Sequence, residues 1–140
     1  MDYSTLALGL LALQLASFAW RITREVDMEG KGKRTWFPLS DWVNVVWLLV
    51  VVTFCIVVPI NSGNFERWPV TALVVGFVLI GFHPISQAAH YRLFSPKGRS
   101  KYEQEHRDYP WITDQEIVVA FASIVAAVLA GCVTWHRLSA

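Results

Sequence analysis

Four long apolar stretches constrain this chain more than any other feature of its sequence. A helix needs about 20 mostly apolar residues to cross the hydrocarbon core of a bilayer. The stretches that reach this length are residues 3–22, 42–60, 69–91 and 113–135. The composition agrees, because 54% of the 140 residues are hydrophobic and the mean hydropathy is +0.40. The sequence therefore predicts an all-α integral membrane protein, with residues 1–140 forming a single transmembrane domain.

The distribution of Lys and Arg predicts how the four helices are oriented. Ten of the twelve lie in or beside the connections that follow the first and third stretches, and only Arg67 and Arg137 lie elsewhere. Because cytoplasmic loops carry an excess of positive charge, residues 23–41 and 92–112 are expected to be cytoplasmic. This gives an antiparallel four-helix bundle built from two tandem hairpins, N-out/C-out, in the plasma (inner) membrane. We expect the first stretch to be a retained span, since Asp2 and no basic residue precede it.

Both basic loops are followed by a signal for the start of a helix. Before the second stretch the chain reads Trp-Phe-Pro-Leu-Ser-Asp, and before the fourth it reads Tyr-Pro-Trp-Ile-Thr-Asp. Thr113 and Glu116 have the spacing of a capping box, in which the two side chains satisfy backbone N–H groups at the helix start. Asp41 and Asp114 lie where a negative charge complements the helix dipole.

The third stretch carries one face of small and polar residues. At about 100° per residue, five side chains fall close to one line along the helix: Ala72, Gly76, His83, Gln87 and His90. Polar groups facing lipid are costly, so this face is expected to point into protein or a wet cavity. Three interpretations remain open: structural hydrogen bonding, a pore, substrate path or proton relay, and a haem or metal site.

Spacing limits the metal interpretation. His83 and His90 are separated by about 10 Å along a helix axis, which is too far for one ion bound to both. We therefore expect no single-chain metal site. Either histidine could instead be an axial ligand of a haem, although the sequence favours no cofactor.

Two further sets of residues are candidates for function. Asp41, Asn44, His90, Asp114 and Glu116 should all lie near the inner membrane surface. Together they would form a cluster suited to cations or protons, and separately the acids would simply cap helices.

The second set is the two cysteines, Cys55 and Cys132, which lie at similar depth near the outer ends of their helices. They are a possible thiol pair if those helices touch, and packing residues otherwise.

Small residues mark two faces for close helix packing, within the bundle or between subunits. On the fourth stretch they are Ala120, Ser123, Ala127, Ala130 and Thr134, and on the first they are Gly9, Ala12, Ala16 and Ala19. Gln14 lies off the latter face and needs another partner.

Three function classes follow from these patterns. We favour a subunit of an oligomeric channel, transporter or larger membrane complex, forming a homo-oligomer and using Gly76, His83, Gln87 and His90 as its polar face. The alternatives are a haem-binding or redox subunit with His83 or His90 as axial ligand, and a small enzyme acting on a lipid-like substrate at the inner interface. No nucleophile or cofactor motif supports an enzyme. The basic loops are expected to contact anionic lipid headgroups, and a net charge of +1 gives no reason to expect nucleic-acid binding.

Overall fold

A computed structural model of the chain describes residues 3–30, 37–58, 67–95, 97 and 112–140. These residues form helices and no strand. The helices are α1 (Tyr3–Gly30), α2 (Leu39–Val52), a π-helical segment η1 (Thr53–Val57) that continues α2, α4 (Arg67–His90) and α6 (Asp114–Ser139). Parts of both predicted cytoplasmic loops lie outside the described residues.

Four helices are long and apolar enough to cross a membrane, which indicates an integral membrane protein. They are Tyr3–Asp27, Leu39–Val57, Arg67–His90 and Asp114–Ser139. Their bounds lie near the predicted ones, except that α1 continues past Ile22 to Gly30. Arg21 and Glu25 therefore belong to a helix that packs in the bundle. The sequence alone had placed Arg21 with the basic residues of the following loop.

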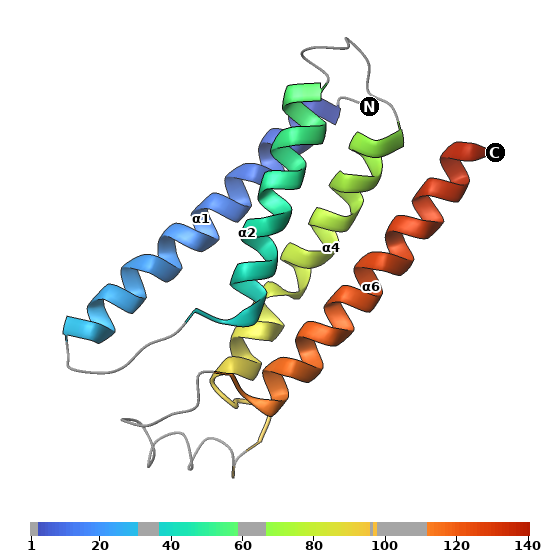
Figure 1. Ribbon diagram of the computed structural model, residues 1–140. Helices are drawn as coiled ribbons and strands as arrows, with labels where there is room; N and C mark the ends of the chain where they lie inside the picture. Colours follow the sequence, from blue (N-terminus) through green and yellow to red (C-terminus); the bar gives the residue numbers. More distant parts are fainter. Residues whose placement is uncertain (1–2, 31–36, 59–66, 96, 98–111) are drawn as a thin grey trace.

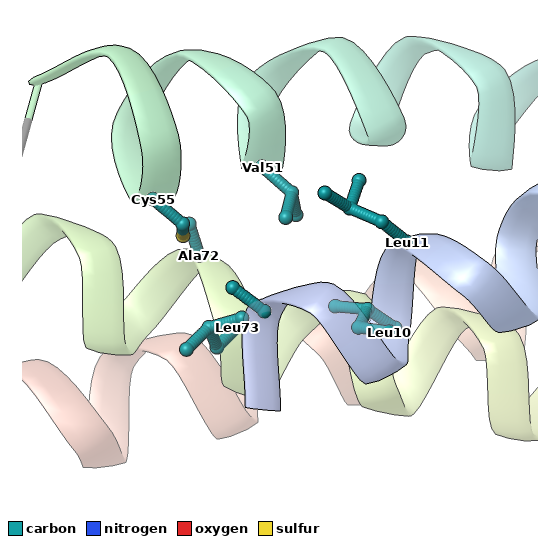
Figure 2. Close-up of a cluster of buried hydrophobic side chains, with 7 residues drawn as sticks. Leu10, Leu11, Val51, Cys55, Ala72 and Leu73 are labelled. Carbon is teal, nitrogen blue, oxygen red and sulfur yellow. The ribbon is translucent and has the colours of Figure 1, made fainter. Parts of the chain in front are cut away.

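Helix α4 is the central helix of the bundle, because it contacts α1, α2, η1 and α6 (Figure 1). The larger apolar cluster of the core lies between α1, α2 with η1, and α4 (Figure 2), and a smaller one lies between α4 and α6. Leu10 and Val51 are fully buried in the larger cluster, and Leu73 is nearly so. The start of α1 and the end of α6 lie at the same end of the bundle (Figure 1).

A glycine allows three helices to meet closely. A Cβ added at Gly76 of α4 would lie 2.6 Å from Leu10 Cδ2 and 3.2 Å from Trp47 Cδ1. The indole N–H of Trp47 in turn donates to the Ala72 carbonyl at 2.9 Å. The small-residue face predicted on the third stretch is therefore used inside the chain.

The two predicted small-residue faces have different outcomes. On α6, Ala120, Ser123 and Ala127 are buried, as expected for a packing face. On α1, the four residues Gly9, Ala12, Ala16 and Ala19 are all exposed, and a Cβ at Gly9 would contact nothing. Of the two alternatives for this face, packing within the bundle does not hold in the structure. The opposite side of α1, which carries longer side chains, faces the core.

The predicted capping box at the start of α6 is confirmed. Thr113 Oγ1 accepts from the Glu116 N–H at 3.0 Å, and the Glu116 carboxylate accepts from the Thr113 N–H at 3.4 Å. The same hydroxyl donates to the Ala89 carbonyl at 3.0 Å, which fixes the start of α6 to the end of α4. Local capping and helix–helix packing thus share one side chain.

Candidate functional site

Asp41, in the first turn of α2, is the centre of a polar cluster between three helices. Its side chain is 2% exposed. The Gln87 amide of α4 donates to its two oxygens at 3.2 and 3.4 Å. His83 Nδ1 lies 3.4 Å from Oδ1, and Arg21 Nε of α1 lies 3.5 Å from Oδ2. The buried carboxylate is therefore hydrogen-bonded by Gln87 of α4 and lies within ion-pair distance of Arg21 of α1.

Arg21 extends this cluster toward the end of α1. It is fully buried, and its guanidinium forms an ion pair with Glu25 at 2.6 Å. It also donates to the side-chain amide oxygen (Oε1) of Gln87 at 3.3 Å and to the Tyr91 hydroxyl. Arg24 stacks over the Tyr91 ring at 4.3 Å and lies 3.4 Å from Glu25.

The polar cluster is defined here as Arg21, Glu25, Asp41, His83, Gln87 and Tyr91. Arg24 lies outside this set but forms an ion pair with Glu25. Together the cluster and Arg24 carry two carboxylates, two arginines and the histidine His83.

Glu116 of α6 is a third buried carboxylate and lies at the start of α2. It is fully buried, and His90 Nδ1 of α4 lies 2.9 Å from its Oε2. Its other oxygen accepts from the backbone N–H of Leu39, the first residue of α2. Helix α2 has no side-chain cap of its own, so a carboxylate from α6 supplies one. Glu116 thereby connects α2, α4 and α6.

The five residues expected to cluster at the inner surface are divided. Asp41 joins the polar cluster, whereas His90 pairs with Glu116. Asn44 donates within its own helix to the Ser40 carbonyl at 2.9 Å. Asp114 has a side chain that is 79% exposed and faces Arg92 at 3.5 Å. The predicted polar face of α4 is divided in the same way, with His83 and Gln87 facing α1 and α2 and His90 facing α6.

A cavity of about 170 Å³ adjoins the polar cluster on the side of the apolar core. Residues of α1, α2 and α4 line it, including Asp41 and His83. Gln14, also in its lining, is 3% exposed, and neither of its amide atoms has a hydrogen-bond partner among the described residues. The polar cluster, the cavity and the apolar core thus follow one another along the bundle.

The structure also bears on the possible thiol pair and on the metal interpretation. Both cysteines are free: Cys55 is buried, with its Sγ 3.4 Å from the Pro69 carbonyl, and Cys132 is exposed. The structure therefore does not pair them. Within the described part of the chain, no three His, Cys, Asp or Glu side chains are placed to hold a metal ion.

Sequence reasoning missed Arg21, Glu25 and Tyr91 as members of the site. The signal was present, since Arg21 and Glu25 are spaced i, i+4 and share a helix face with Gln14. Those positions lie on the side of α1 opposite its small residues. This face of α1 was not recognised because Arg21 was counted only among the basic residues of the following loop.

No protein-family model, curated protein sequence or solved structure matches the chain.

Proposed function

We propose that the protein is a subunit of an oligomeric membrane channel or transporter in which the polar cluster handles protons or a small cation. The observation that supports this most is the convergence of Arg21, Asp41 and His83 from three apolar helices. Ionisable groups inside membrane segments are costly and mark ion paths and proton relays more often than structural sites.

The cost of burial argues for a use beyond stability. Replacing a buried ion pair with well-packed apolar residues is often neutral or stabilising, so such a pair is weak evidence for a structural role. Here Arg21 and Asp41 are each at most 2% exposed. Retaining both inside a bundle is consistent with a function that needs charge there.

The topology we propose follows the distribution of basic residues. The bundle is antiparallel and N-out/C-out in the plasma (inner) membrane, with residues 23–41 and 92–112 cytoplasmic and near anionic lipid headgroups. The polar cluster then lies toward the cytoplasmic side, because it uses the end of α1, the start of α2 and the end of α4.

Two observations support an oligomer. Among the described residues, the buried charged side chains lie toward the end of the bundle that holds Asp41, which is about 15 Å along α2 from Val51 in the apolar core. A complete path then needs a second copy or another subunit. The exposed face of Gly9, Ala12, Ala16 and Ala19 provides small residues for a helix–helix contact outside the bundle.

The two alternatives have less geometric support. His83 already contacts Asp41, and His90 contacts Glu116, so a haem at either histidine would have to displace an intrachain contact. For an enzyme at the inner interface, the buried Ser86 hydroxyl of α4 has no hydrogen-bond partner among the described residues, so no base activates it.

Flux measurements test the proposal. The full-length protein is reconstituted in vesicles containing a pH-sensitive or Na⁺-sensitive dye, and a K⁺ diffusion potential is imposed. We expect dye-detected H⁺ or Na⁺ entry above that of empty vesicles. Asp41→Asn, which keeps shape but removes the charge, should reduce the rate by about tenfold or more.

Ser40→Ala is the matched control, since Ser40 is buried beside Asp41 and its hydroxyl has no partner among the described residues. It should conduct like the wild type. Wild-type vesicles that match empty ones with both dyes would overturn the proposal. An Asp41→Asn protein with the wild-type rate would also overturn it.

A further inference from the structure

The polar cluster already contains a fixed cation, the guanidinium of Arg21. This side chain is fully buried, and a guanidinium keeps its charge in proteins. Four side chains place an oxygen beside it: Glu25 at 2.6 Å, Gln87 at 3.3 Å, Asp41 at 3.5 Å, and Tyr91 through its hydroxyl. The guanidinium therefore has the oxygen neighbours that a bound metal ion would need.

A mobile metal cation is disfavoured at this position. It would lie close to the charge of Arg21, and like charges repel strongly where water does not screen them. Hard metal cations are also bound by several oxygen ligands at once. In the part of the chain that the structure describes, no three His, Cys, Asp or Glu side chains are placed to supply such a set.

A proton needs only one acceptor, and His83 provides one. Its Nδ1 lies 3.4 Å from Asp41 Oδ1, and its Nε2 lies 3.5 Å from the Gln87 amide nitrogen. A neutral imidazole fits these neighbours when its N–H is on Nδ1, beside the carboxylate, and its lone pair is on Nε2, beside the amide donor. That lone pair is then the place where the imidazole takes up a proton.

Charged groups from α1 and α2 act on His83 in opposite senses. Asp41 of α2 and Arg21 of α1 both interact with it electrostatically, and His90 of α4 interacts with Asp41 in turn. His90 lies 2.9 Å from Glu116 of α6, so it has a carboxylate of its own. The positive and negative charges on either side of His83 favour neither protonation state alone, which suits a group that gains and loses a proton.

We propose that the ion handled by the polar cluster is the proton, that His83 beside Asp41 takes it up and releases it, and that Arg21 excludes metal cations by occupying their oxygen ligands. On uptake, the imidazole lone pair forms an N–H bond with the incoming proton, and the positive charge faces the Asp41 carboxylate. Release breaks the same bond. This inference rests on the proposed function, because it names the ion for the same site.

Separate proton and sodium fluxes test the inference in the reconstituted full-length protein. Vesicles that contain either the pH-sensitive or the Na⁺-sensitive dye are given the same K⁺ diffusion potential. We expect H⁺ entry above that of empty vesicles and Na⁺ entry equal to that of empty vesicles. Adding external Na⁺ at constant pH and ionic strength should leave the H⁺ rate unchanged.

His83→Gln removes the imidazole but keeps a side chain that can hydrogen-bond to Asp41. It should lower the H⁺ rate by about tenfold or more, because an amide does not take up a proton in this pH range. His136→Gln is the matched control, since His136 of α6 is exposed and lies outside the polar cluster. It should keep the wild-type H⁺ rate. The comparison of H⁺ with Na⁺ uses the wild-type protein, so it does not depend on whether His83→Gln folds.

The possible results separate this inference from the proposed function. Na⁺ entry through the wild-type protein would overturn the inference and leave ion handling by the polar cluster standing. A folded His83→Gln protein with the wild-type H⁺ rate would overturn the role of His83, as would an equal loss in His136→Gln. No response from either dye in wild-type vesicles would overturn both proposals together.

Discussion

At the scale of single residues, both carboxylate oxygens of Glu116 have partners in the described structure. One oxygen accepts from the Leu39 N–H, and the other accepts from the Thr113 N–H and lies 2.9 Å from His90. Every neighbour is a donor, or becomes one on protonation. An ionised carboxylate, which only accepts, suits this environment in a way that an amide does not.

Glu116→Gln should therefore destabilise the protein although it preserves shape. The new NH₂ group must face at least one of the donors around it, leaving buried groups unpaired. We expect a loss of about 2–4 kcal/mol, measured as reduced thermal stability in detergent by tryptophan fluorescence. Asp114→Asn, which changes an exposed carboxylate in the same helical turn, should stay within about 0.5 kcal/mol of the wild type. Equal losses in the two variants would contradict this account of Glu116.

The sequence predicted part of this arrangement. Thr113 and Glu116 gave a capping box because that motif is local, and the structure contains it. The partners Leu39 and His90 are far away in the chain, and no periodicity specifies which carboxylate reaches them. Likewise, the face of α4 was predicted to point into protein or a wet cavity, but its division between α2 and α6 depends on where those helices pack.

At the scale of helices, the bundle depends on where small residues allow close approach. Gly76 and Gly81 are both within α4, yet a Cβ at Gly76 would meet Leu10 and Trp47, whereas one at Gly81 would meet nothing within 4 Å. Gly76 is therefore needed for close helix packing, whereas Gly81, five residues later in the same helix, is not.

Gly76→Ala should destabilise the protein by about 1–3 kcal/mol, because Leu10 is fully buried and has little room to move. Gly81→Ala should be neutral or stabilising by up to about 1 kcal/mol, since alanine favours helix and the site is open. Chemical or thermal unfolding of both variants in one detergent gives the comparison. A greater loss from Gly81→Ala would show that α4 packs differently.

The same scale explains why the small residues of α1 do not pack within the bundle. Small residues at spacings of three and four predict close packing but not the partner that packs against them. In α1 the residues that face α2 and α4 are longer, among them Leu10, Gln14 and Arg21. The spacing of that second face was visible in the sequence, but Arg21 was counted with the basic residues of the loop that follows the span.

At the scale of the whole molecule, the exposed face of α1 bears on assembly. If Gly9, Ala12, Ala16 and Ala19 meet another copy, Ala16→Leu should weaken association by about tenfold or more by preventing close approach. Ala122→Leu makes the same change at an exposed alanine of α6 and should leave association unchanged. Sedimentation equilibrium in density-matched detergent measures both, and wild-type association of Ala16→Leu would exclude this face as the contact.

The position of Glu116 late in the chain also has a consequence for biosynthesis. Helices α1, α2 and α4 are all made before the residue that caps Leu39 and contacts His90. Until the ribosome has delivered the fourth span, the beginning of α2 and the end of α4 are without that shared carboxylate. The start of α2 and the end of α4 therefore gain their shared carboxylate only after α6 has been synthesised.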